Sequence, residues 1–244
     1  MPRMPTHDPR TVAREIPGLF DSIFPQLTPG VVGHFNRTSE SGDCEPVSQE
    51  LIQSATLGKA MLFELGYAVG EVLLIEGDID WDQCIQIALA RQRRHFDAKL
   101  PDRVESVDKA ASLHVGENLA YMMRALAAEI DGPIVSSPMI PGFQWVASGH
   151  GDFSINSTLI EVKCSNKNFS AADYRQVVMY WLLSFSAALE GVEAEWTDGI
   201  LLNPRAGKLV RFKFDELLHV ISAGRSKVEI LQLFQSMVGT RGVR

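Results

Sequence analysis

Two charged residues, of types that metal-binding and acid–base chemistry use, lie in an apolar stretch near the middle of the chain. Glu161 and Lys163 lie in TLIEVKC, a stretch that is typical of a buried strand. Because side chains alternate across a strand, Glu161 and Lys163 share one face with Leu159, and the other face can pack normally. Two charges on a buried strand need a chemical reason.

The preceding segment points to that reason. Asp152 begins DFSI, which leads into the polar turn NST. A two-residue Asn156-Ser157 hairpin loop, or a four-residue loop centred on the same bond, places Asp152 directly opposite Glu161, with Cβ atoms about 5 Å apart. At an effective dielectric constant of about 20, two such charges repel by roughly 3 kcal/mol. A sequence selected only for stability would avoid this pair, so we interpret it as a cation site.

A hard divalent cation would convert the repulsion into attraction. Carboxylate oxygens are the ligands that Mg²⁺ or Mn²⁺ prefers, and Lys163 beside them can approach a phosphate or the attacking water. The alternative is that Glu161 and Lys163 form an ordinary pair on an exposed strand face, as charged residues often do on half-exposed strands. The tripeptide EVK does not by itself decide between the two.

The next segment predicts a helix that carries a polar pair. Ser170 and Asp173 form a capping box, which predicts a helix start at residue 171. Gln176 and Tyr180 are four residues apart and therefore share a helix face. A buried glutamine here requires hydrogen-bond partners, whereas on a half-exposed helix it would be incidental. The apolar stripe comprises Tyr174, Val177, Val178, Trp181, Leu182 and Phe185.

Asp152, the tripeptide EVK and the segment QVVMY together resemble the pattern GxD…(D/E)xK…QxxxY of the PD-(D/E)xK nuclease superfamily, in its RecB-type branch. The resemblance covers residues 110–220. It implies an α/β fold with a restriction-endonuclease-like core, in which helices flank a mixed β-sheet, preceded by a mainly helical N-terminal region. The proline that usually precedes the aspartate is absent, and GHGD stands in its place.

The resemblance also implies residue roles. Asp152 and Glu161 would bind Mg²⁺ or Mn²⁺, with the backbone carbonyl of Val162 as a further ligand. Lys163 would orient or activate the attacking water and stabilise the charge that develops on the phosphate. One metal ion and two are both compatible with this set.

Three more positions match the family. Gln176 and Tyr180 would position the substrate backbone and support the site. Glu117, in a helix expected over 111–130, matches a glutamate that adds a metal ligand in many members. Glu117 lies away from the main apolar stripe of that helix, so a solvated side chain accounts for it equally well.

Charge is unevenly distributed along the chain. Residues 1–105 hold 10 Lys and Arg against 16 Asp and Glu, whereas residues 106–244 hold 13 against 14. The acidic N-terminal half suggests a surface for a protein partner. A basic set in NPRAGKLVRFKF is the candidate nucleic-acid contact, although charge runs are equally often a solvated face. Its members are Arg205, Lys208, Arg211 and Lys213.

The remaining pattern sets the expected organisation. Residues 1–46 are rich in Pro, Gly and Ser and predict a loop with one short helix. A helix is expected over 47–66, ending at its glycine, and 67–77 is compatible with strand or helix. A further helix is expected over 78–100, with Asp80 as its N-cap. Residues 100–106 form the linker to a nuclease-like domain over 106–244.

Strands and helices in that second part predict an α/β layout. PIVSSPMI and FQWVASG are expected to be strands around a Pro-Gly turn. DGILLNP and KLVRFKF are expected to be strands after the helix that starts at 171, and a final helix is expected to begin near Asp215. One helix, several strands and a second helix followed by two strands indicate a mixed sheet.

These features predict a metal-dependent nuclease that acts on DNA, with RNA not excluded, in restriction, anti-phage defence, repair or mobile-element processing. The alternatives are a catalytically idle nuclease-fold subunit and an enzyme acting on another phosphoester. Three cysteines without a CxxC pair suit a reducing cytoplasm and argue against a cysteine-bound metal. No apolar run is long enough for a transmembrane helix. The sequence is compatible with a homo-oligomer.

Overall fold

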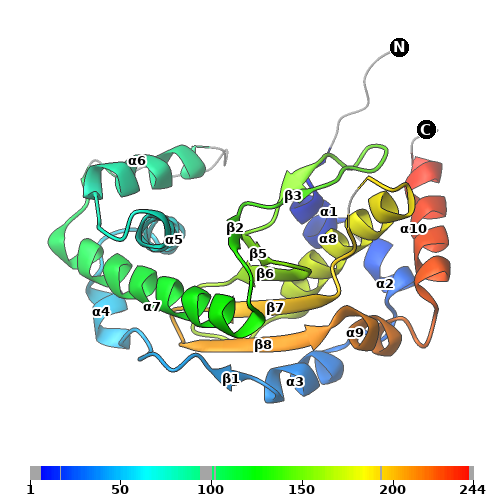
Figure 1. Cartoon of the computed structure of the whole chain (residues 1–244), viewed down its shortest axis with the longest axis horizontal. Helices are drawn as coiled ribbons and strands as arrows, with labels where there is room; N and C mark the ends of the chain where they lie inside the picture. Colours follow the sequence, from blue (N-terminus) through cyan, green and yellow to red (C-terminus); the bar gives the residue numbers. More distant parts are fainter. Residues whose placement is uncertain (1–6, 17, 94–100, 102, 193, 242–244) are drawn as a thin grey trace, which may run out of the picture.

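The computed structural model describes residues 7–16, 18–93, 101, 103–192 and 194–241. These residues form an α/β structure in which a mixed sheet of six strands lies between two groups of helices (Figure 1). None of the described helices is both long and apolar enough to cross a membrane. The predicted fold class, a mixed β-sheet flanked by helices, is confirmed.

Along the chain, helices come before, between and after the strands. The helices are α1 Pro9–Glu15, α2 Leu19–Ile23, α3 Pro29–Arg37, α4 Gln49–Ser54, α5 Lys59–Ile75, α6 Trp81–Gln92, α7 Ser106–Ile130, α8 Ala171–Leu189, α9 Phe214–Ile221 and α10 Lys227–Arg241. The strands are β1 Glu40–Ser41, β2 Ile134–Ser136, β3 Met139–Ile140, β4 Gly149–His150, β5 Phe153–Ile155, β6 Thr158–Val162, β7 Asp198–Asn203 and β8 Lys208–Lys213.

The strand order in the sheet is β1-β8-β7-β6-β5-β2. Only β6 and β7 pair in parallel among these six, and α8 is the crossover between them, because parallel neighbours cannot be joined by a tight turn. The other four pairs are antiparallel. β3 and β4 form a separate two-stranded ribbon.

Each face of the sheet is buried against its own group of helices. Leu159 packs with α1, α2, α8 and α10, whereas Ile160 and Val162 pack with α7. Figure 1 shows α7 on one side of the sheet and α8 with α1, α2 and α10 on the other. The predicted alternation along β6 is therefore confirmed, and Glu161 points toward the α8 side.

The N-terminal residues contain more helix than the sequence predicts. Prolines suggested a loop with one short helix, yet Pro9 and Pro29 each stand at the first turn of a helix. Proline is favoured there because the first N–H groups of a helix have no internal partner. Asp8 and Thr28 cap these two helices.

The predicted helix end at Gly66 is wrong. A break after α4 is followed by α5, which runs through Gly66 and takes in most of the ambiguous segment 67–77. The glycine serves close packing, because a Cβ at Gly66 would lie 2.8 Å from Cγ1 of Val115 on α7. A Cβ at Gly116 would meet Cγ1 of Val69 at 2.5 Å.

Other predicted elements show mixed outcomes. Asp80 caps α6 as predicted, through the backbone N–H groups of Asp82 and Gln83. FQWVASG is not one strand: Phe143 and Val146 bridge each other across a turn, and only its last residue, Gly149, belongs to a strand, β4. The helix predicted to begin near Asp215 starts at Phe214 as α9, and it is not the last helix, because α10 follows it. The end of the helix predicted over 78–100 and part of the linker predicted over 100–106 lie outside the described residues.

The predicted division near residue 105 does not divide the core. Val12 and Phe20, from the N-terminal part, share a cluster with residues of α8, and Tyr67 of α5 shares one with residues of α7. β1 pairs with β8. The N-terminal region thus completes both layers around the sheet.

Candidate metal-binding and catalytic site

The β5–β6 hairpin has the predicted register. Phe153 pairs with Ile160, and Ile155 pairs with Thr158. Asn156 in the turn has φ 51°, a left-handed conformation that Asn tolerates better than most residues. This register brings Asp152 and Glu161 to the same end of the hairpin, one position beyond the last regular pair.

The Asp152 carboxylate is held by backbone. Its Oδ2 accepts a hydrogen bond of 2.8 Å from the N–H of Val162. Its own backbone carbonyl accepts from the N–H of Ser137 at 2.9 Å and from the Tyr67 hydroxyl at 3.3 Å. The Asp152 side chain is 16% exposed, so one edge of the carboxylate reaches solvent.

Glu161 lies at the centre of the cluster and is fully buried. Lys163 Nζ donates to its Oε1 at 2.6 Å, and Gln176 Nε2 donates to the same oxygen at 2.6 Å. Lys163 Nζ also donates to Gln176 Oε1 at 3.0 Å. The three groups form a closed triangle of hydrogen bonds.

Helix α8 supplies the wall of the site opposite β6. Ser170 and Asp173 form the predicted capping box at its start. Gln176 is fully buried, and its Nε2 also lies 2.9 Å from the Tyr180 hydroxyl. The predicted requirement of a buried glutamine for partners is met by Lys163, Glu161 and Tyr180.

Arg10 was not predicted from the sequence and comes from α1. Its Nη2 lies 3.5 Å from Glu161 Oε1 and 3.9 Å from Asp152 Oδ1. Burial lowers the pKa of Arg10, but Glu161, Tyr180 and Asp152 outweigh this effect and raise it above its ordinary value. The Asp8-Pro9 pair was a usable signal for a helix start at this point, but no local pattern indicates which strand the helix would meet.

Burial dominates the electrostatics of the pair. Burial and, next, the Glu161 charge raise the pKa of Asp152 to about 7, against the opposing effects of Lys163, Arg10 and the Val162 N–H. Burial and Glu161 also raise the pKa of Tyr180, so this phenol stays protonated. The raised pKa of Asp152 therefore reflects mainly the cost of holding a charged carboxylate away from water.

One oxygen of the cluster stands apart. Glu161 Oε2 is buried and has no hydrogen-bond partner within the described part of the chain. Such an atom is costly unless something else satisfies it. Together with Asp152 Oδ1 it offers hard oxygen donors, the type that Mg²⁺ and Mn²⁺ accept.

The donor set fits a divalent ion that keeps other ligands. Within the described ranges, no cluster of three or more His, Cys, Asp or Glu side chains is arranged to hold a metal. Asp152 and Glu161 would therefore share the ion with water, a phosphate oxygen or the Val162 carbonyl. The carbonyl contribution of Val162 stays a prediction.

The prediction that Glu117 adds a ligand is not supported by its position. Glu117 is exposed on α7, and α7 packs on the face of the sheet that carries Ile160 and Val162. Glu161 points to the opposite face. The solvated side chain that its helical position allowed is the better description.

A second, partly buried network supports Asp152 from α5 and α6. Tyr67 stacks on Phe153 at 5.5 Å between ring centroids, and the Arg91 guanidinium lies 4.8 Å above the Tyr67 ring. Arg91 is bound to Glu71 at 2.5 Å, and Glu71 accepts from Ser136 Oγ at 2.9 Å. These residues were not predicted, because their contacts join helices and strands that are distant in the sequence.

The predicted basic set is divided between the two ends of the sheet. Arg205 and Lys208 lie at the β7–β8 turn, at the same end as Lys163, whose N–H bonds to the Leu202 carbonyl. Arg211 lies farther along β8 and makes a two-pronged pair with Glu129 on α7, at 2.7 Å for both bonds. Arg211 is thus neutralised within the fold.

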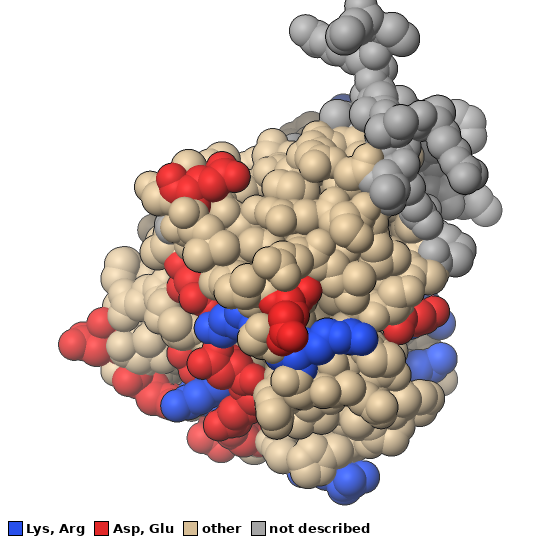
Figure 2. All heavy atoms as spheres, turned by 90° about the vertical axis from the view of Figure 1, so that its right-hand side faces the viewer, with Lys and Arg blue, Asp and Glu red and all other residues tan. Residues whose placement is uncertain are grey.

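The surface charge is mixed on the face shown in Figure 2. There Lys and Arg side chains lie beside Asp and Glu side chains instead of forming one continuous basic area. This face offers no evident electrostatic footprint for a nucleic acid.

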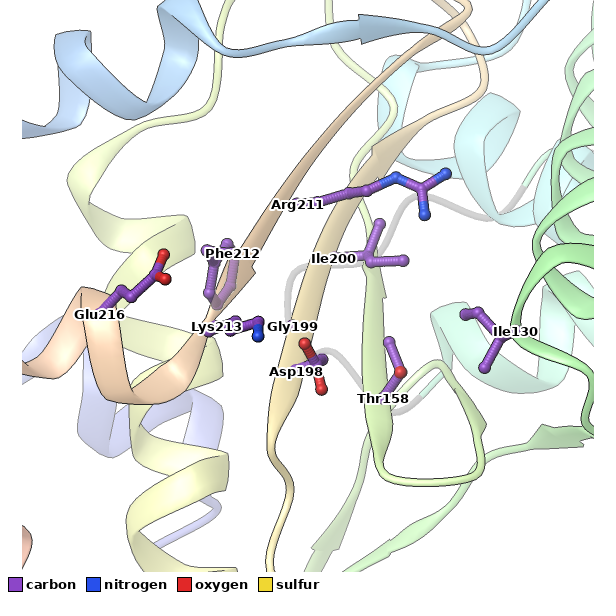
Figure 3. A pocket seen from close by; sticks show the side chains of 9 residues that line it. All are labelled: Ile130, Thr158, Asp198, Gly199, Ile200, Arg211, Phe212, Lys213 and Glu216. Atoms are coloured by element: carbon purple, nitrogen blue, oxygen red, sulfur yellow. The ribbon is translucent and has the colours of Figure 1, made fainter.

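A pocket of about 440 Å³ lies at the other end of the sheet from Glu161. Thr158 and Asp198, the first residues of β6 and β7, line it together with Lys213 and Glu216 (Figure 3). Its charges are of both signs, and Arg211 at its edge is already paired. The carboxylate cluster, with its unsatisfied oxygen, is the stronger candidate for chemistry.

Comparison of the chain with family models, with curated proteins and with solved structures yields no match. The case for a function therefore rests on the residues of this cluster and their geometry.

Proposed function

We propose that the protein is a metal-dependent nuclease that hydrolyses phosphodiester bonds, with DNA as its substrate. The observation that carries the proposal is that Lys163 binds one oxygen of the buried Glu161, whereas the other oxygen, Oε2, has no hydrogen-bond partner among the described residues, and that Arg10 lies within 4 Å of both Glu161 and Asp152. Hydrolysis of a phosphodiester requires a cation near the phosphate, an oriented water and a group that stabilises the developing charge.

The residues would divide these tasks. Asp152 and Glu161 would hold Mg²⁺ or Mn²⁺, which would act as a Lewis acid and lower the pKa of a bound water. Lys163 donates hydrogen bonds from a position beside both carboxylates and would orient the attacking water or a phosphate oxygen. Gln176 fixes the Lys163 ammonium, and Tyr180 fixes Gln176.

The finer fold assignment belongs to the same proposal. A long helix, an antiparallel hairpin, a crossover helix and a parallel strand follow one another in α7, β5–β6, α8 and β7. This order agrees with the restriction-endonuclease-like core that the motifs imply. The cluster stands at the end of β6.

Cleavage of DNA by single variants tests the proposal. Wild-type protein should cut duplex or single-stranded DNA with Mg²⁺ or Mn²⁺ and not with EDTA, and Asp152→Ala, Glu161→Ala and Lys163→Ala should each abolish cutting. Lys167→Ala is the matched control, because Lys167 is an exposed lysine four residues away. Undiminished cutting by any of the first three variants would refute the assigned site.

The same experiment addresses the idle nuclease-fold subunit. A protein that binds DNA and metal but cuts neither DNA nor RNA would support that alternative. Cutting of RNA alone would keep the mechanism and change the substrate.

A further inference from the structure

Arg10 places a second cation at the carboxylate pair, although Lys163 already binds Glu161 at 2.6 Å. The guanidinium lies 3.5 Å and 3.9 Å from the two carboxylates, beyond the 2.7–2.9 Å that is typical of a charged hydrogen bond. Arg211 shows what a closed structural pair looks like in this protein, with two bonds of 2.7 Å to Glu129. Arg10 is near both carboxylates without being locked to either.

The backbone that carries Arg10 is fixed. Val12 is fully buried and Ala13 is 3% exposed, and α1 packs along α8. Arg14 on the same helix pairs with Asp173 at 3.2 Å. The Arg10 side chain is nevertheless 43% exposed, against 16% for Asp152 and 0% for Glu161, so it is the most solvent-accessible of the three.

Charge balance indicates what happens when a cation binds. The two carboxylates and the two basic side chains have a net formal charge of zero. A divalent ion would leave the site with two excess positive charges, and like-charge repulsion would weaken the hold of the carboxylates on the guanidinium. A phosphodiester carries one negative charge, so the freed guanidinium and the phosphate are complementary.

Resting on the nuclease function proposed above, we propose that Arg10 is a further catalytic residue, one that binds the scissile phosphate of the metal-loaded protein. Arginine suits this role because its planar fork binds two phosphate oxygens at once. Without metal, the same guanidinium compensates the charge of the carboxylates. The N-terminal helix is then a permanent part of the active site.

DNA binding with and without metal tests this role apart from cleavage. The experiment uses the cleavage-deficient Lys163→Met protein, a fluorescent DNA duplex and a salt titration in Mg²⁺ or in EDTA. Adding Arg10→Met should weaken binding in Mg²⁺ at least several-fold and reduce the slope of log K against log salt by about 1, the value of one lost phosphate contact. In EDTA it should change neither.

Arg14→Met is the matched control, since Arg14 lies on the same helix with a 40% exposed side chain, and it should leave the slope unchanged. Arg10→Lys keeps the charge but not the fork. In the Lys163→Met background, Arg10→Lys should restore the salt slope that Arg10→Met loses. As a single substitution, Arg10→Lys should make the protein cut more slowly than wild type. If Arg10→Met does not fold by its melting curve, the cutting rate of Arg10→Lys is the test, and cutting at the wild-type rate overturns the proposal.

Three results bear on the proposal differently. An unchanged slope for Arg10→Met in Mg²⁺ overturns it and leaves the nuclease function intact. Faster cutting by the single Arg10→Met variant also overturns it, because the guanidinium would then merely obstruct the metal. If wild-type protein neither binds metal nor cuts nucleic acid, the proposed nuclease function is wrong, and the role of Arg10, which rests on it, is wrong too.

Discussion

At the scale of single residues, the two oxygens of Glu161 have different surroundings. Oε1 accepts from Lys163 and Gln176 and lies near Arg10, whereas Oε2 has no hydrogen-bond partner among the residues described. A purely structural buried glutamate would be expected to satisfy both oxygens. The asymmetry fits a carboxylate that is fixed on one side and presents the other side to a ligand.

Gln176→Ala should lower cleavage by about 10- to 100-fold, a usual cost of losing a residue that orients the groups around a metal. Metal affinity should stay close to that of wild type, because the amide contacts Glu161 Oε1 and not Oε2. Isothermal titration with Mn²⁺ and cleavage rates measure the two effects. Gln232→Ala, an exposed glutamine on α10, is the control. Loss of Mn²⁺ binding would place Gln176 among the ligands.

The raised pKa of Asp152 should appear in the pH dependence of stability. In the folded protein the pKa is about 7, above the ordinary value of 3.8, so between these values the folded state binds more protons than the unfolded state. Stability in EDTA should therefore fall as pH rises from about 4 to about 7 because of Asp152. Urea unfolding of wild type and Asp152→Asn isolates this component as the difference between them. A difference that is constant with pH would contradict the raised pKa.

The sequence predicts most of this cluster and omits Arg10. Asp152, Glu161 and Lys163 were accessible because alternation in strands and a two-residue turn fix their register. Gln176 and Tyr180 were accessible because helical spacing puts them on one face. Arg10 was not, because its position depends on how α1 packs on α8, and packing between distant segments leaves no periodic signal.

At the scale of elements, three segments build the site: the β5–β6 hairpin, α8 and α1. The hairpin and α8 were predicted with nearly correct limits, because a polar turn and a capping box mark their ends. The short N-terminal helices were not, because Pro and Gly were interpreted as loop signals. Pro9 and Pro29 in fact start helices after a capping residue, so the residue before each proline carried the missing information.

Helices α5 and α7 cross closely through glycines, and this contact helps to hold the layer behind Asp152. In Gly116→Ala the new Cβ would lie 2.5 Å from Val69 Cγ1 and 2.9 Å from the Gly70 backbone nitrogen. The variant should lose about 1–3 kcal/mol of unfolding free energy, the usual cost of overpacking.

Gly33→Ala provides the matched control for that variant. The nearest atom to a Cβ at Gly33 is Arg37 Nη1 at 3.8 Å, so the helix α3 should gain about 0.5–1 kcal/mol from better helix propensity. Urea unfolding of both variants is the measurement. A Gly116→Ala protein as stable as wild type would mean that α5 and α7 leave room for a methyl group at this contact.

At the scale of the whole molecule, the acidic N-terminal residues are built into the same core as the site. α1 contributes Arg10, and α5 supports Asp152 through Tyr67. A partner that binds this region would therefore contact elements that are directly attached to the carboxylate cluster. Docking of such a partner stays a prediction.

The central claim is that Asp152 and Glu161 share a divalent cation, and thermal unfolding tests it most directly. At pH 8 Asp152 is mostly ionised, since its pKa is about 7. In EDTA, Asp152→Asn should be more stable than wild type by about 1–3 kcal/mol, because it removes a buried, repelled charge. Asp78→Asn, at an exposed position, should match wild type.

Millimolar Mg²⁺ or Mn²⁺ should then raise the melting temperature of wild type, because a ligand that binds only the folded state stabilises it. The same ions should do little for Asp152→Asn, so the two melting temperatures should converge or cross during the metal titration. If wild type is instead the more stable protein in EDTA, and metal shifts both proteins equally, the two carboxylates do not share a cation.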